Sequence, residues 1–356
     1  MKFISTMKCS QLILLLIVSI VISCKSYEKG DLKTLRSSVF IAAENLHSPY
    51  SVGIFNDSLL IVGNYKSDFI IDIFNINDKK NVKSFKNDQK GLDLVSVTTI
   101  QTFVNNDYSF CINDILTNKL ICFNKEIDDY KIKLDSSSLI NLPREDYGKL
   151  LVGKNVWIGE SRSSNGRLLL VDKDKQSLGF FLDYPSPDKI SKYIDEKNNA
   201  KLYQPMFSLK PTMDRLAVAT YGADLINVLN VKESNLEELW RRYRAYPNDI
   251  KLIKLGYDSL AVKSNRSKMY YHDITSNNHG FYLSYLGQAV SYYTKDYFSD
   301  KIYFYDWTGE KVITYNLDRK VVRIAINMDN SILYALSPDE NGQLEIISFD
   351  IDHELL

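Results

Sequence analysis

The sequence predicts an all-β fold, a six-bladed β-propeller whose ring is closed by an N-terminal strand that completes the last blade. Three observations predict it. Residues 301–317 have the pattern of a hairpin with one apolar face, similar patterns recur along the chain, and the last copy lacks an outer strand. A length of 356 residues, 45% of them hydrophobic and 12% aromatic, is enough to bury the large core of such a ring.

The hairpin at residues 301–317, KIYFYDWTGEKVITYNL, alternates apolar and polar residues on both sides of a Trp-Thr-Gly-Glu turn. This pattern predicts two strands whose side chains Ile302, Phe304, Val312 and Thr314 share one buried face. Two strands alone cannot keep such a face dry. We therefore expect further copies of the unit to pack against it.

An apolar residue followed by Asn or Asp ends an apolar run six times, and each pair is expected to close the third strand of a blade. The polar members are Asn75, Asn124, Asp172, Asn230, Asp306 and Asp350, which are 49, 48, 58, 76 and 44 residues apart. Second strands are expected at 58–65, 108–114, 155–161, 215–222, 280–286 and 331–337. Innermost strands are expected at 50–55, 98–103, 148–153, 205–210, 269–275 and 321–326.

Outer strands are expected after five of the six pairs, at 81–85, 130–134, 177–182, 236–243 and 311–317. The sixth pair has almost no chain after it. Residues 34–42, TLRSSVFIA, are expected to supply the missing strand and to join the two chain ends, which removes exposed sheet edges. A long loop over 246–268 would explain the spacing of 76. The alternative is a seventh blade with His272-Asp273 as its marker, only 33 residues before Asp306.

The N-terminus has the pattern of an export signal. Lys2 and Lys8 precede an apolar run over 12–22, which is too short to span a bilayer as a helix and is typical of a signal-peptide core. Residues 21–24, Val-Ile-Ser-Cys, resemble the lipobox of bacterial lipoproteins, in which the leader is cut before the Cys and the thiol receives a diacylglycerol. An ordinary leader cut near Ser23 is the alternative, but it would leave a reactive unpaired Cys24.

Lipidation at Cys24 would hold a water-soluble body on a membrane, because several acyl chains on one residue anchor a protein stably. We expect a leader over 1–23, the lipidated Cys and a polar tether over 24–32, and the propeller over 33–356. Lys25 stands where an Asp would be the inner-membrane retention cue, so the resemblance implies the outer membrane of a bacterial cell envelope. The periplasmic and the surface face are both compatible with the sequence.

Charge and motifs exclude several classes of protein. Basic and acidic side chains number 44 each, so no strongly basic surface for nucleic acid is expected. The chain contains no HExxH, CxxC, GxSxG or glycine-rich phosphate loop. We therefore expect no catalytic residues, no cofactor and no bound metal, although an enzymatic role stays open.

The lipobox, the short tether and the hairpins over 302–351 together resemble the TolB-like six-bladed propeller lipoproteins of Bacteroidetes. The resemblance covers essentially the whole mature chain, is most specific from Met269 onward and is weakest at 246–268 and in blades two and three. It implies a propeller fold, an envelope location and a non-catalytic binding or scaffolding role at the channel face. The implied partner is an unknown protein, peptide or glycan.

Cys111 and Cys122 lie symmetrically about the turn at 115–118, so strand pairing places them opposite each other. A cross-strand disulfide is expected if they occupy a non-hydrogen-bonded pair in an oxidising compartment. The alternative is two buried thiols that act as small hydrophobic side chains.

Two aromatic segments are candidates for partner binding. Trp240, Arg241 and Arg242 interleave Arg with aromatics, although an exposed outer strand explains the same pattern. The loop from Gly287 to Asp300 is expected at the rim of the central channel, where its aromatics offer contact area to a partner or fold down as a lid. These aromatics are Tyr292, Tyr293, Tyr297 and Phe298.

The alternative function is that of a metal-dependent hydrolase, as in propellers of the lactonase type, which hold a divalent cation with oxygen ligands in the channel. Glu160, Asn113 and Asp114 are candidates for that role, and they fit equally well as strand ends and turn residues. His272, Asp273 and His279 form a second, weaker candidate across one turn. A third hypothesis is a surface glycan-binding component of a nutrient-uptake system.

Overall fold

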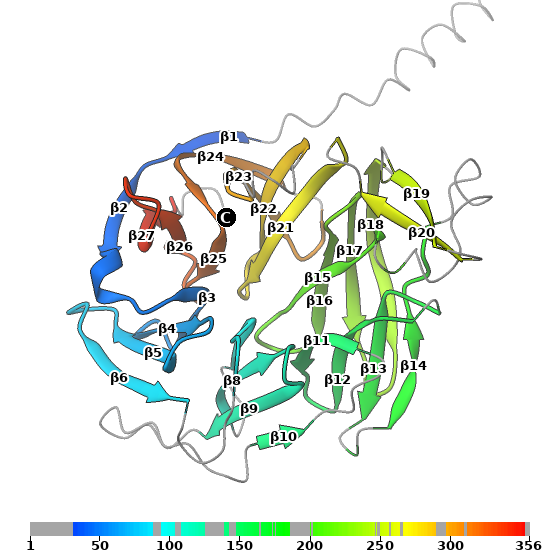
Figure 1. Ribbon diagram of the computed structural model, residues 1–356, viewed down its shortest axis with the longest axis horizontal. Coiled ribbons are helices and arrows are strands. Elements are labelled where there is room, and N and C mark those ends of the chain that lie inside the picture. Colours follow the sequence, from blue (N-terminus) through cyan, green and yellow to red (C-terminus); the bar gives the residue numbers. More distant parts are fainter. Residues whose placement is uncertain are drawn as a thin grey trace, which may run out of the picture.

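The computed structural model describes residues 31–87, 94–103, 108–124, 139–141, 147–163, 165–172, 174, 176–185, 200, 202–245, 247, 250–255, 258–263, 266–289, 297–309 and 312–352. In this part of the chain six β-sheets stand around a central axis and form a closed ring (Figure 1). Cys24 and the expected leader lie outside the described residues, as does the tether except for Asp31 and Leu32. No helix in the described part is long and apolar enough to cross a membrane.

Each sheet is one blade, and its strands follow one another outward from the axis in chain order. Blade one holds β3 (Pro49–Phe55), β4 (Leu59–Asn64), β5 (Phe69–Asn75) and β6 (Asn81–Lys86). Blade two holds β7 (Thr99–Thr102), β8 (Tyr108–Asp114), β9 (Lys119–Asn124) and β10 (Leu139–Asn141). Blade three holds β11 (Tyr147–Val152), β12 (Val156–Ser161), β13 (Leu168–Asp172) and β14 (Ser177–Phe181).

The second half of the ring repeats this plan. Blade four holds β15 (Pro205–Leu209), β16 (Arg215–Thr220), β17 (Asp224–Val231) and β18 (Leu236–Ala245). Blade five holds β21 (Lys268–Ser276), β22 (Gly280–Ala289), β23 (Ser299–Asp306) and β24 (Val312–Val321). Blade six holds β25 (Arg323–Ile326), β26 (Ile332–Pro338) and β27 (Leu344–Asp350).

The predicted closure by the N-terminus is confirmed. β2 (Ser37–Ile41) pairs antiparallel with β27 and supplies the outer strand of blade six. The structure also contains a strand that the sequence did not predict. β1 (Asp31–Leu35) pairs in parallel with β24 as a fifth strand of blade five. Figure 1 shows the two strands running along the outside of both blades. The N-terminal segment therefore ties two neighbouring blades together.

The middle strands of each blade are apolar on both faces because a neighbouring blade covers each face. The opening hairpin illustrates this, since Ile302 and Phe304 pack with Leu333 and Phe349 of blade six in one buried cluster. Each such buried side chain contributes roughly 1.5 to 3 kcal/mol to folding.

One part of the expectation for this hairpin was wrong. Ile302 lies opposite Tyr315 and Phe304 lies opposite Ile313, so these residues of β24 share the buried face. Thr314 lies opposite Tyr303 and is on the other face. Because Tyr305 lies opposite Val312, the even-numbered residues of β23 lie opposite the odd-numbered residues of β24, and the expectation assigned the wrong face of β24.

Two other segments differ from the sequence expectations. The long loop expected over 246–268 contains an antiparallel hairpin of β19 (Ile250–Leu255) and β20 (Asp258–Lys263), which forms a sheet of its own. The alternative of a seventh blade is wrong, because His272 lies in β21, the innermost strand of blade five. The outer strand expected at 130–134 lies outside the described residues, and the strand that pairs with β9 is β10.

Candidate binding site in the central channel

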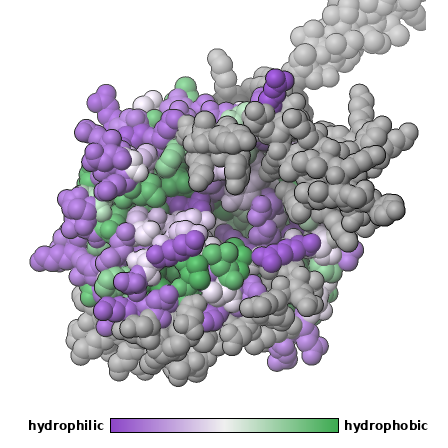
Figure 2. Space-filling view, viewed as in Figure 1, coloured by the Kyte–Doolittle hydropathy of each residue, from purple (hydrophilic) through white to green (hydrophobic). Residues whose placement is uncertain are grey.

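The innermost strands of all six blades line a cavity of about 100 Å³ on the axis of the ring. Figure 2 shows the ring hollowed at its centre, where hydrophilic and hydrophobic surfaces meet. Hydroxyl and amide side chains form much of the wall, and three charged residues join them: Lys149 of β11, Asp273 of β21 and Arg323 of β25. The inner strands approach closely, because a Cβ on Gly53 of β3 would lie 2.6 Å from Ile100 of blade two.

Arg323 is the first residue of β25, and its guanidinium is held by the backbone and by a histidine. Nε donates to the carbonyl of Tyr50 at 3.1 Å, and Nη1 donates to the carbonyl of Val322 at 3.2 Å. Nη1 also lies 3.0 Å from Nε2 of His272. The guanidinium sits 5.1 Å from the centre of the Tyr50 ring, within the range of a cation–π contact.

The contact with Arg323 fixes the tautomer of His272. A guanidinium only donates hydrogen bonds, so Nε2 accepts and the neutral ring carries its hydrogen on Nδ1. Burial, reinforced by the nearby positive charge of Arg323, lowers the pKa of His272 to about 3. Among the described residues Nδ1 has no hydrogen-bond partner. His272 thus places an unused donor beside the charged wall of the cavity.

Lys149 and Asp273 complete the charged wall. Lys149 Nζ donates to the carbonyl of Phe207 at 3.0 Å, and burial lowers the pKa of this lysine to about 8. An Asp273 carboxylate oxygen accepts the N–H of Ile324 at 2.8 Å, and burial raises the pKa of Asp273 although Arg323 opposes the shift. The cavity wall therefore carries two cations and one carboxylate.

Glu160 lies behind this wall on the second strand of blade three. One of its carboxylate oxygens accepts the N–H of Lys149 at 3.4 Å. Burial raises the pKa of Glu160, and the hydrogen bond from the Lys149 backbone opposes the shift. The carboxyl group is thus within electrostatic reach of Lys149 without lining the cavity.

Aromatic side chains surround Arg323 and His272 at one end of the channel. The His272 ring stacks on Tyr297 with centroids 5.7 Å apart, and Tyr221 meets it edge-on at 6.1 Å. Tyr50, which contacts Arg323, lies 5.5 Å from Tyr65. We refer to this group as the channel mouth; its members are Tyr50, Tyr65, Tyr221, His272, Tyr297 and Arg323.

Part of the aromatic loop of blade five lies at the channel mouth. Tyr297 lies at the channel, as expected, and Phe298 follows it just before β23; both are half-buried. Tyr292 and Tyr293 lie outside the described residues. The part of the loop that can be placed thus packs against the innermost strand of its own blade.

The structure places two of the three candidates on β18 between blades four and five. Trp240 packs 5.9 Å from Tyr305 of blade five. Arg242 bonds Asp224 at 3.3 Å and the Tyr271 hydroxyl at 2.8 Å, and its guanidinium lies 4.8 Å from the Tyr305 ring. These two side chains tie blade four to blade five.

Arg241 is the exposed member of the three. It pairs with Glu238 on its own strand at 2.8 Å. It is the one candidate of this stretch that stays accessible to a partner.

Cys111 and Cys122 lie opposite each other in β8 and β9 and form a disulfide with Cα atoms 4.0 Å apart. Both are almost completely buried in the core of blade two. The disulfide joins the second and third strands of this blade within that buried cluster.

The candidates for a metal site are not brought together. Asn113 and Asp114 are occupied by the backbone: the Asn113 side chain accepts from the N–H of Leu150, and Asp114 accepts from the N–H groups of Val95 and Ser96. Within the described ranges no three His, Cys, Asp or Glu side chains are close enough to hold a metal ion.

The histidine candidates are also apart. His272 lies in the channel, whereas His279 lies exposed in the turn after β21. The oxygen and nitrogen donors that the alternative function needs therefore do not converge among the residues described.

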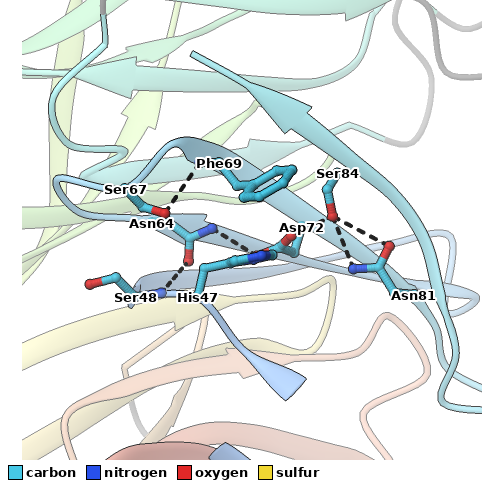
Figure 3. Close-up of polar contacts among 8 residues, drawn as sticks. All are labelled: His47, Ser48, Asn64, Ser67, Phe69, Asp72, Asn81 and Ser84. Atoms are coloured by element: carbon cyan, nitrogen blue, oxygen red, sulfur yellow. Dashed lines mark hydrogen bonds and ion pairs between the residues drawn. The ribbon is translucent and has the colours of Figure 1, made fainter. Parts of the chain in front are cut away.

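A polar cluster in blade one contains a Ser, a His and an Asp, and its geometry does not suit nucleophilic catalysis (Figure 3). His47 Nδ1 lies 2.8 Å from one oxygen of Asp72, and Ser84 donates to the other at 2.6 Å. A catalytic triad needs the histidine between the serine and the acid, so that the imidazole takes the serine proton. Here the acid is in the middle, and Asn64 donates to it as well at 2.8 Å.

Most residues of the channel wall and mouth were not identified from the sequence. Lys149, Arg323, Tyr50 and Tyr221 lie in four different blades, and no local spacing connects them. One signal was available. Tyr50 and Arg323 lie within the predicted innermost strands at 50–55 and 321–326, and the innermost strands of all six blades line the central cavity.

Comparison with solved structures shows the fold. A Bacteroides fragilis protein inferred to be exported has a TM-score of 0.51 and 9% identity, with 90% of this chain and 99% of that chain covered. Chaetomium thermophilum Raptor has a TM-score of 0.50 and 10% identity, with 91% of this chain and 29% of that chain covered. No curated protein matches the chain in sequence.

Family membership rests on the sequence itself. The profile of the family described as TolB-like 6-blade propeller-like matches residues 28–329. This range contains the innermost strands of all six blades and the residues of the channel mouth. Because the match spans most of the sequence, the chain belongs to the TolB-like 6-blade propeller-like family.

Proposed function

We propose that the protein is a lipid-anchored lipoprotein of a bacterial cell envelope, on the outer membrane, and that it binds a protein, peptide or glycan partner at its channel mouth without catalysing a reaction. The observation that carries the proposal is the channel mouth itself. Aromatic side chains from blades one, four and five are grouped there around a guanidinium, and their surfaces are half-exposed at the end of an open cavity.

Such a group suits binding for a physical reason. Tyrosine rings offer large contact areas and lose little conformational entropy when a partner covers them. Burial raises the pKa of Tyr221 to about 12, so its hydroxyl stays protonated and is able to donate. The disulfide between Cys111 and Cys122 supports export to an oxidising compartment, and the lipobox at residues 21–24 supports an anchor at Cys24.

The binding role is tested by crosslinking in the cells that make the protein. A photoreactive phenylalanine analogue is placed at Tyr297, and a matched control carries it at Leu178, an exposed residue on the outer rim of blade three. We expect a discrete crosslinked product from position 297 and none from position 178. Products of equal yield at both positions, or no product at 297, contradict partner binding at the mouth.

The anchor is tested separately. Labelled palmitate should enter the wild-type protein, and Cys24→Ala should abolish the label and release the protein into a soluble fraction. Protease treatment of intact cells then distinguishes the surface face from the periplasmic face. A Cys24→Ala variant that stays in the membrane fraction contradicts the anchor.

A further inference from the structure

We propose that the cavity below the channel mouth is a binding site for a single carboxylate group, held by Arg323 and Lys149. The inference rests on the proposed function and deepens it, because it names the chemistry of the group that enters the channel. Both side chains line the cavity, and they come from blades six and three.

The size of the cavity limits what enters it. Its volume of about 100 Å³ is smaller than the cavity of about 150 Å³ that accepts one benzene ring. A sugar ring or a folded-back peptide segment is too large for this space. A group of a few atoms at the end of a ligand fits, while the rest of the ligand lies against the aromatic residues of the mouth.

The charge of the wall favours a monoanion. Behind the lining of the cavity, Glu160 interacts with Arg162 as well as with Lys149. Among the residues that line the cavity, two cations, Lys149 and Arg323, face one carboxylate, Asp273, which leaves one excess positive charge. A single carboxylate balances it. A phosphate dianion would exceed it and would be repelled by Asp273. A cationic group would be repelled by Lys149 and Arg323.

The donors needed for a carboxylate are present. Lys149 uses one of its three N–H groups on the Phe207 carbonyl. Arg323 uses Nε and Nη1 for its bonds to Tyr50, Val322 and His272, and Nη2 takes no part in these bonds. Hydrogen bonds from charged donors to a carboxylate are about twice as strong as neutral ones.

The proposal is tested by calorimetric titration at fixed ionic strength and pH 7. The probes are the tripeptide acetyl-Ala-Ala-Ala with a free C-terminal carboxylate, the same peptide with a C-terminal amide, acetate, and methylammonium as a cation control. We expect the acid to bind at least tenfold more tightly than the amide, acetate to compete with it, and methylammonium to have no effect. An acid that binds more tightly than acetate identifies a peptide terminus as the source of the carboxylate, and equal affinities identify free small acids.

Variants assign the site. Lys149→Met and Arg323→Gln should each weaken binding of the acid about tenfold or more. Asp273→Asn should strengthen it, because it removes the opposing charge and keeps an acceptor for the Ile324 N–H. Lys154→Met, at an exposed lysine in the turn after β11, is the matched control and should change nothing. Thermal melts establish that each variant is folded.

The outcomes separate the two proposals. Equal binding of acid and amide, or unchanged binding in both Lys149→Met and Arg323→Gln, overturns the carboxylate site. If crosslinks at position 297 persist in that case, partner binding at the mouth stands without it. If the acid binds but position 297 gives no crosslink, the carboxylate site stands and the macromolecular partner does not.

Discussion

The cluster around Asp72 should hold the closing segment of the ring to blade one, and its removal should destabilise the protein measurably. Asp72 is completely buried, and its carboxylate accepts hydrogen bonds from His47, Asn64 and Ser84 (Figure 3). His47 lies in the connection between β2, which closes blade six, and β3, which begins blade one. The cluster therefore joins the two ends of the ring.

The magnitude follows from what Asp72→Ala leaves behind. The Asn64 side chain is 2% exposed, so its amide loses its acceptor without gaining water, which costs about 1 to 3 kcal/mol. Ser84 and His47 are partly exposed and recover solvent, so each adds about 0.5 to 1.5 kcal/mol. We expect a loss of about 3 kcal/mol in the free energy of unfolding, and about 1 kcal/mol for His47→Ala.

The assay is denaturant unfolding followed by tryptophan fluorescence, with Asp72→Ala, His47→Ala and the double variant as a thermodynamic cycle. The coupling between the two residues should be about 1 kcal/mol. Asp68→Ala, at an exposed position of the same blade, is the control and should stay within about 0.5 kcal/mol of the wild type. An Asp72→Ala value no larger than this control, or a coupling near zero, refutes the reasoning.

Four further outcomes are expected. The wild type should lose stability as the pH falls from 6.5 towards 3, because His272 has a pKa of about 3 in the folded protein and only the unfolded chain binds its proton in that window. His272→Gln should remove part of this loss, and acid titration of both proteins checks it. Between pH 8 and 10.5 the wild type should gain stability, because Lys149 is protonated in the unfolded chain and, with a pKa of about 8, is not protonated in the folded protein. Lys149→Met should remove part of this rise. Equal slopes of the free energy of unfolding against pH in both proteins would contradict this. Arg242→Met should cost about 3 kcal/mol, because it leaves the buried Asp224 carboxylate without a charged partner and only the Tyr271 hydroxyl to bond it. Arg241→Met on the exposed face should cost less than about 1 kcal/mol, and thermal melts of both variants check the difference. Cys111→Ser should cost about 3 kcal/mol by releasing a short loop, and mass spectrometry of unreduced wild type should find no alkylated thiol in blade two.

Much of the fold is readable from the sequence because each blade repeats one local pattern. Strands that are buried on both faces are continuous apolar runs, and the polar residue that ends each run marks the turn. The predicted outer strand at residues 34–42 was also readable, because SSVFI has the composition of a strand; it pairs with β27. β1 has no such signal, because only Leu35 in DLKTL is buried. Its partner β24 fixes its position, and that contact is not encoded locally.

Two other expectations from the sequence were wrong for local reasons. The hairpin of β19 and β20 lies where a loop was expected, although IKLIKL and DSLAVK carry enough apolar residues for strands. This hairpin does not fit the repeat pattern, because an extra pair of strands between blades four and five breaks the four-strand period. The buried face of β24 was assigned wrongly because the expectation grouped even-numbered residues of both strands, whereas the turn pairs even-numbered residues of β23 with odd-numbered residues of β24.

The site was predicted less well than the fold because its residues converge only through the ring. Tyr297 was expected at the channel, and the structure places it against His272. Arg323 and Lys149 are separated by half of the chain, and each looks like an ordinary charged residue at the start of a strand. Their importance follows from the geometry of a propeller, in which the innermost strands of all six blades line the central cavity.

The charged groups of the channel join neighbouring blades, as Arg242 does, but their burial costs folding free energy. Arg242 is paired with Asp224 of its own blade and donates to the Tyr271 hydroxyl of blade five, so it holds two blades together. Lys149 has its pKa lowered by burial, Asp273 has its pKa raised by burial, and Nδ1 of His272 has no partner among the described residues. Burying such groups costs folding free energy that an apolar or hydroxyl-bearing channel would not lose. Each of the three charged groups also bonds the backbone of the next blade, Lys149 at Phe207, Asp273 at Ile324 and Arg323 at Tyr50, so these groups join neighbouring blades while they line the cavity that we propose as a binding site.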